Sequence, residues 1–119
     1  MNFVTSLFSA APDGRTALVR GAESVSYGHL RAGVQAWAAE LRRAGLRPGD
    51  RVGILAENSR FSVTAYLAAM HAGCVAVPMA PGTPMSSLQA QLTMSDVRLV
   101  CLERRYAERL RTSEVLPLL

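Results

Sequence analysis

From residue 51 onward, short apolar runs alternate with longer segments of helical period, and this alternation constrains the fold more than any other feature. The runs occupy residues 51–56, 74–78 and 98–102. They show little polar alternation, which is typical of strands with both faces covered. Strands joined by crossover helices pair in parallel through right-handed connections. The sequence therefore predicts an α/β fold: a small β-hairpin followed by βαβαβα, forming an open, mostly parallel sheet with helices packed on it.

The segment before the first apolar run is predicted to form the small hairpin and one long helix. Residues 18–25 read as two extended pieces around a glycine turn. Ser26 is placed to cap the helix that follows, and Gly45 can take the left-handed conformation of a residue just past a helix end. Leu46 can then fold back onto the last turn before Pro48 prevents continuation. The apolar face of this helix consists of Tyr27, Leu30, Val34, Trp37, Ala38 and Leu41.

Three further helices are expected between and after the apolar runs. Asn58 or Ser59 is expected to cap a helix from about residue 60 to residue 71, which Gly73 ends. Thr83 is expected to cap the next helix, with Pro84 at its first helical position. Met85, Leu88 and Leu92 give the inner face of that helix, and Tyr106 with Leu110 gives the inner face of the last.

Composition indicates one ordered domain. A chain of 119 residues with 50% hydrophobic side chains is long enough for one core but not for two, so we expect a single domain over residues 1–119. No apolar run approaches the roughly 18 residues that cross a bilayer, and the first residues lack the pattern of a secretory signal. We therefore expect no membrane span and a cytoplasmic protein. Cys74 and Cys101 are too few for a disulfide framework or a zinc site and are expected to be small buried hydrophobes.

All thirteen basic residues are arginine, because the sequence contains no lysine, and the net charge is +4. Clusters of arginine raise the possibility of nucleic-acid binding. No aromatic residues interleave with them as a stacking platform would require, and two of them fall where a helix C-terminus attracts cations. We therefore expect no nucleic-acid partner. The clusters are Arg42, Arg43, Arg47 and Arg51, and Arg104, Arg105, Arg109 and Arg111.

The residue types that carry chemistry do not form a recognisable site. No glycine-rich phosphate turn follows the first apolar run, and a P-loop is excluded by the lack of lysine. His29 and His71 have no acid or nucleophile at helical spacing and are expected to be structural. Asp50, Glu57 and Asp96 are expected to be turn or cap residues. The sequence thus predicts no catalytic, cofactor-binding or metal-ligating residue in this segment.

Several motifs resemble, in order and spacing, those of the adenylate-forming (AMP-dependent synthetase/ligase) superfamily. Residues 25–30, Val-Ser-Tyr-Gly-His-Leu, are similar to its first core motif, and residues 45–52, Gly-Leu-Arg-Pro-Gly-Asp-Arg-Val, match its Gly-x-x-x-Gly-Asp-x-Val helix exit. Residues 56–59 resemble the turn after the next strand, and residues 70–79 resemble a second core motif that ends in Pro-Leu. Two departures stand out: His29 replaces the usual glutamate and Ala80 replaces the Asp or Asn common after Pro-Leu.

The resemblance implies the incomplete first part of the large N-terminal domain, and the apolar last residues suggest a truncated or split chain. In that family a carboxylate and ATP give an acyl-adenylate, which a thiol converts to a thioester. ATP, Mg and CoA are implied for a full-length member, whereas no position here matches a catalytic motif, so the segment alone is expected to be inactive. The likeness favours an acyl-CoA synthetase of fatty acid metabolism. The alternatives are a fragment of a nonribosomal peptide synthetase adenylation domain and a non-catalytic interaction module, with the remainder of the ligase or another protein as partner.

Overall fold

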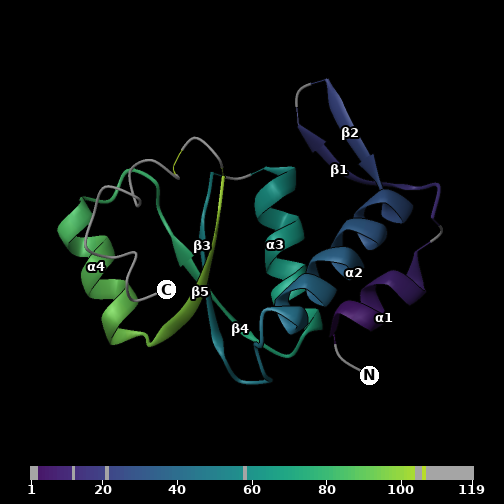
Figure 1. Cartoon of the computed structure of the whole chain (residues 1–119). Coiled ribbons are helices and arrows are strands. Elements are labelled where there is room, and N and C mark those ends of the chain that lie inside the picture. Colours follow the sequence, from purple (N-terminus) through teal and green to yellow (C-terminus); the bar gives the residue numbers. More distant parts are fainter. Residues whose placement is uncertain (1–2, 12, 21, 58, 104–105, 107–119) are drawn as a thin grey trace.

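The computed structural model describes residues 3–11, 13–20, 22–57, 59–103 and 106. It has three layers, in which a parallel sheet lies between α4 on one side and α1, α2 and α3 on the other (Figure 1). This arrangement confirms the expected α/β class. In chain order the elements are α1 (Phe3–Ala10), β1 (Thr16–Arg20), β2 (Glu23–Ser26), α2 (Tyr27–Arg43), β3 (Arg51–Leu55), α3 (Arg60–His71), β4 (Val75–Met79), α4 (Met85–Met94) and β5 (Val97–Leu102).

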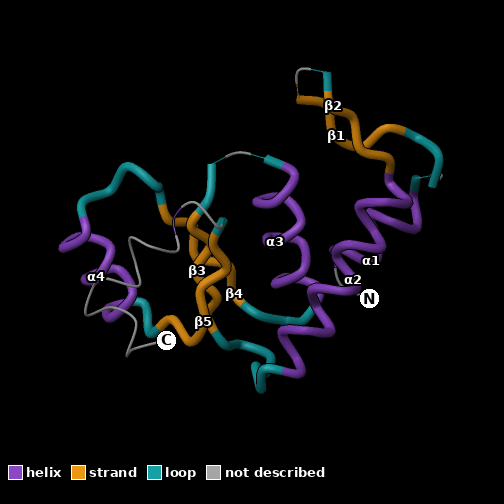
Figure 2. The backbone as a smooth tube through the Cα atoms, turned by 45° about the horizontal axis from the view of Figure 1, so that its top comes forward, coloured by secondary structure: helices purple, strands orange, loops and turns teal. Residues whose placement is uncertain are grey.

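The three apolar runs form one parallel sheet in the order β4-β3-β5, with β3 in the centre (Figure 2). Ile54 pairs with Pro78 on one side and with Cys101 on the other. Burial follows this order, because Val52, Gly53, Ile54 and Leu55 are all buried in the central strand. Proline is tolerated in β4 since that strand lies at the edge of the sheet.

The predicted hairpin is present, and Figure 2 shows it away from the parallel sheet, at the start of α2. Its strands β1 and β2 are antiparallel, with Leu18 opposite Val25. The segment before β1 also contacts the first turn of α2, where the Gly28 N–H donates to the Asp13 carbonyl at 2.8 Å. A Cβ on Gly28 would lie 3.2 Å from that same oxygen, so the close approach favours glycine.

Helix α2 begins and ends as the sequence predicts. The Ser26 side chain accepts a hydrogen bond from the His29 N–H, and the buried face contains Leu30, Val34, Ala38 and Leu41. At its end, Gly45 has a φ of 95°, its N–H donates to the Arg42 carbonyl, and the Leu46 N–H donates to the Leu41 carbonyl. These two bonds define a Schellman motif, in which Leu46 folds back against the core.

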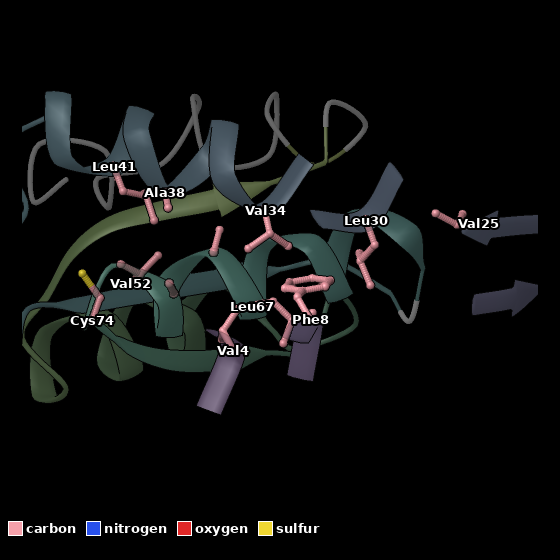
Figure 3. Packing of buried hydrophobic residues seen from close by; sticks show 12 residues of the cluster. Val4, Phe8, Val25, Leu30, Val34, Ala38, Leu41, Val52, Leu67 and Cys74 are labelled. Atoms are coloured by element: carbon pink, nitrogen blue, oxygen red, sulfur yellow. The ribbon is translucent and has the colours of Figure 1, made fainter. Parts of the chain in front are cut away.

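Helix α1 was not predicted from the sequence. It packs against α3, and it buries Val4 and Phe8 in the same cluster as Val34 and Leu67 (Figure 3). An eight-residue helix is too short to be stable alone, so packing rather than its own periodicity must hold it. Asp13, which follows α1, forms an ion pair with Arg31 of α2.

The start of α4 differs from the expectation. Pro84 is the N-cap residue, with φ −57° and ψ 148°, and no side chain caps the helix. The expected cap at Thr83 with Pro84 inside the helix is therefore wrong by one position, because Pro84 takes an extended ψ. Leu88 and Leu92 are buried, as expected, against Leu55 and Met79 on the second face of the sheet. The last predicted helix, with Leu110, lies outside the described residues, whereas Tyr106 packs on this second face.

Candidate functional site

The carboxyl ends of β3 and β5 form the place where an open α/β sheet ordinarily binds a ligand. The chain leaves β3 toward the face covered by α3, and after β5 it leads to Tyr106, which packs on the face of α4. Adjacent strands whose connections leave to opposite faces define a topological switch point, and ligands bind in the crevice outside it. The edge of the sheet outside the carboxyl ends of β3 and β5 is therefore the first candidate site.

Two glutamates, Glu57 and Glu103, lie at these strand ends. A carboxylate oxygen of Glu103 accepts a hydrogen bond from the Glu57 N–H at 3.1 Å, and the Glu103 N–H donates to the Leu55 carbonyl at 3.4 Å. The Glu103 carbonyl accepts from the Tyr106 N–H at 2.9 Å. A carboxylate across the strand ends accepts hydrogen bonds and repels phosphate, so these strand ends are unsuited to holding a nucleotide phosphate by themselves.

The nearby N-terminus of α3 is capped by side chains of its own first turn. The Ser59 hydroxyl accepts from the Ser62 N–H at 3.2 Å, and the Ser62 hydroxyl accepts from the Ser59 N–H at 2.9 Å. This capping box confirms Ser59 as the cap, one of the two residues expected for that role. The box satisfies the N–H groups of Ser59 and Ser62, so these two donors are not free to bind an anion.

Both histidines lie where the sequence places them. His29 is exposed in the first turn of α2, and His71 is half-buried in the last turn of α3, where its carbonyl accepts from the Arg42 guanidinium at 3.3 Å. Among the described residues, no three His, Cys, Asp or Glu side chains come together as a possible metal site. The prediction that no catalytic or metal-binding residue lies in this segment stays a prediction.

Both cysteines are free thiols within the packed part of the chain. Burial, with a smaller contribution from Asp50, raises the pKa of the Cys74 thiol, which Arg42 only partly opposes. Burial raises the pKa of Cys101 to about 11. Both thiols are therefore protonated at neutral pH and are weak nucleophiles and metal ligands. Cys74 is buried as expected, whereas Cys101 is only half-buried.

The described arginine cluster lies at the opposite, amino edge of the sheet. Arg42 and Arg43 end α2, Arg47 lies in the following turn, and Arg51 begins β3; all four are exposed. A carboxylate oxygen of Asp50 accepts from the Arg47 N–H at 2.9 Å, which makes it the turn residue expected. The second cluster, from Arg104 to Arg111, lies outside the described residues.

Asp96 also has the turn role expected of it. It precedes β5 with a φ of 52°, a left-handed conformation that aspartate tolerates better than most residues.

Glu57 follows β3 as expected, but its contact with Glu103 was not visible in the sequence, because 46 positions separate the two residues. Only the pairing of β3 with β5 brings them together.

The described residues form an open parallel sheet with helices on both faces, and those at the switch point form no phosphate loop. The model of the AMP-binding enzyme family matches residues 8–118, and the chain belongs to this family. The resemblance to adenylate-forming enzymes is thereby confirmed. No helix that the structure describes is both long and apolar enough to cross a bilayer.

Three relatives illustrate the range of the family. The L-proline–[L-prolyl-carrier protein] ligase of Streptomyces coelicolor is 32% identical over 99 residues, which cover 83% of this chain and 18% of that protein. The fatty acid AMP ligase of Legionella pneumophila is 29% identical with a TM-score of 0.74, over 90% of this chain and 20% of that one. VinN in complex with L-aspartate is 28% identical with a TM-score of 0.80, over 91% of this chain and 28% of that one. The chain thus spans less than a third of each relative.

Proposed function

We propose that this chain forms the first part of the adenylating domain of an ATP-dependent ligase that activates an amino acid. In such a reaction the substrate carboxylate attacks the α-phosphorus of ATP, giving an aminoacyl-adenylate and pyrophosphate. A thiol then displaces AMP and forms a thioester. The match over residues 8–118 carries this proposal, and the likeness to a prolyl-carrier protein ligase and to a protein that binds L-aspartate supports an amino acid as substrate.

In this proposal the chain contributes a scaffold and no chemical group. ATP and Mg²⁺ are implied by the family, but the described residues at the switch point do not fit the phosphates of ATP. The Glu103 carboxylate accepts hydrogen bonds where a phosphate would need donors, and the capping box occupies donors at the start of α3. We therefore assign no step of the reaction to these residues, and we expect the chain alone to be inactive.

A carrier protein is the acceptor that we favour for the activated acid. The S. coelicolor ligase acts on a carrier protein, whereas nothing in the chain favours CoA. Activation of a fatty acid, which the sequence motifs favoured, is a second candidate, because the Legionella fatty acid AMP ligase shares 29% identity with most of this chain. These two candidates differ in substrate and share the adenylate intermediate.

Pyrophosphate exchange tests the proposal directly. The whole protein that carries this chain would be incubated with ATP, labelled pyrophosphate and one acid at a time, drawn from the standard amino acids and from fatty acids of eight to sixteen carbons. Exchange that depends on one amino acid, with none from residues 1–119 alone, is the expected result. Exchange with fatty acids only would favour the second candidate, and no exchange with any acid would favour a non-catalytic interaction module.

A further inference from the structure

Glu103 connects the exits of the two strands that define the switch point. Its N–H donates to the Leu55 carbonyl at 3.4 Å, and its side chain accepts from the Glu57 N–H at 3.1 Å. Its own carbonyl accepts from the Tyr106 N–H at 2.9 Å. One residue therefore joins the end of β3, the start of the segment that leads to α3, and the turn that follows β5.

The pairing of β3 with β5 explains why this side chain reaches Glu57. Leu55 pairs with Leu102 in the regular part of the ladder, and Glu103 comes next. Cys101 packs on the sheet face that α3 covers, and Leu102 packs on the face of α4. Because side chains alternate between the two faces of a strand, Glu103 falls on the same face as Cys101. The chain leaves β3 toward this same face, so the carboxylate meets the backbone of Glu57 there.

The hydrogen bond between Glu103 and Glu57 fixes a position in the backbone. Glu57 is exposed and Glu103 is half-buried, so water can satisfy the Glu57 N–H as well as a carboxylate can. A carboxylate that accepts from a backbone N–H forms a charge-assisted bond, about twice as strong as one between neutral groups. What the Glu103 side chain adds is therefore a defined place for the backbone of Glu57 beside the end of β5.

The backbone held in this way lies beside the first candidate site. Ligands of open α/β sheets bind outside the carboxyl ends of the strands, at the switch point. Glu57 also lies two residues before Ser59, whose capping box begins α3. A shift of the Glu57 backbone would consequently move the exit of β3 and the entry to α3 together.

We propose that Glu103 is a positioning residue of the ligase, which holds the backbone at Glu57 and so sets the edge of the adenylating site. This inference rests on the proposed function, because it concerns the site where the acid and ATP react. Glu103 acts through the backbone of its neighbour, and no step of the reaction is assigned to its carboxylate.

Hydrogen exchange and steady-state kinetics test this role in the whole protein that carries the chain. Glu103→Ala should speed amide exchange at Glu57 on the order of tenfold, the scale of one charge-assisted hydrogen bond, as measured by mass spectrometry of overlapping peptides. In pyrophosphate exchange, the KM for ATP or for the amino acid should rise roughly tenfold, because a smaller fraction of molecules holds the binding arrangement. Loss of folded protein alone would lower kcat per mole of chain and leave both KM values unchanged.

Conservative variants separate the hydrogen bond from the charge. Glu103→Gln keeps an oxygen that accepts from the Glu57 N–H, so its KM values should stay within about threefold of the wild type. Glu103→Asp is one methylene shorter and should behave like Glu103→Ala. Glu23→Ala, which removes an exposed glutamate from β2, is the matched control and should change neither KM nor exchange at Glu57.

The outcomes distinguish this role from the proposed function. An active wild type whose KM values are unchanged in Glu103→Ala would overturn the positioning role alone. Equal losses in Glu103→Gln and Glu103→Ala would also overturn it, because they would show that the charge acts rather than the hydrogen bond. A wild type that exchanges pyrophosphate with no acid would overturn the proposed function, and the positioning role with it.

Discussion

Replacing Gly45 by alanine isolates the contribution of one backbone conformation to stability. Gly45 has a φ of 95°, and a Cβ built there meets no atom within 4 Å, so the change introduces conformational strain without a clash. The left-handed region costs a residue with a Cβ about 1–2 kcal/mol. Alanine also restricts the unfolded chain more than glycine does, which offsets part of this cost. We expect the free energy of unfolding to fall by about 1 kcal/mol.

Urea denaturation followed by far-UV circular dichroism measures this change, and a thermal melt should show Tm lowered by about 4 °C. Gly14→Ala is the matched control, because its Cβ also meets nothing within 4 Å and its φ is not positive. It should change stability by less than about 0.5 kcal/mol. Gly45→Asn should lose less than Gly45→Ala, since asparagine tolerates the left-handed region. Equal stability of the Gly45→Ala and Gly14→Ala proteins would refute the assignment of a Schellman motif at the end of α2.

Three further outcomes are expected. Leu88→Ala should lower the free energy of unfolding by about 2–5 kcal/mol in urea denaturation, because Leu88 is fully buried between α4 and the sheet; a loss below 1 kcal/mol would mean that this layer is loosely packed. Ser59→Ala should cost about 1 kcal/mol in the same assay through loss of the capping box, while Ser86→Ala, on the exposed side of α4, should cost little. Cys101 should react slowly with a thiol reagent at pH 8 and faster as the pH rises toward 11. Its pKa in the folded state lies above the ordinary value of 9.0, so the folded state keeps the thiol proton to a higher pH than the unfolded state does. The free energy of unfolding should therefore fall as the pH rises from 9 to 11. Rapid modification of folded protein at pH 8 would contradict the raised pKa of Cys101.

The start and end of α2 could be predicted because their signals are local. Ser26, Gly45 and Leu46 each act within one or two turns of the residues they contact, so the order of residue types is sufficient to place them. The three strands follow from the same kind of evidence, since short apolar runs between glycine and proline are typical of a covered sheet. The family motifs extend this reading, and the match over residues 8–118 confirms it.

The cap of α4 shows the limit of local evidence. Thr83 followed by Pro84 fits a helix start with proline inside the first turn, yet the helix begins one residue later and Pro84 becomes the cap. Pro84 as the cap and Pro84 as the first helical residue both satisfy the fixed φ of proline. The two positions differ only in the ψ of Pro84, which the neighbouring structure determines. Helix α1 is a second case, because its eight residues are held by Val4 and Phe8 against α3 and carry little signal of their own.

The sequence by itself determined the class of fold, the order of elements and the family, because periodicity, caps and motif spacing are properties of neighbouring residues. Tertiary structure alone decided which distant residues meet: Glu57 with Glu103 at the switch point, and Trp37 with Phe61 between α2 and α3. Such contacts depend on strand order and helix packing, and no local pattern encodes the separation in space of residues far apart in the chain.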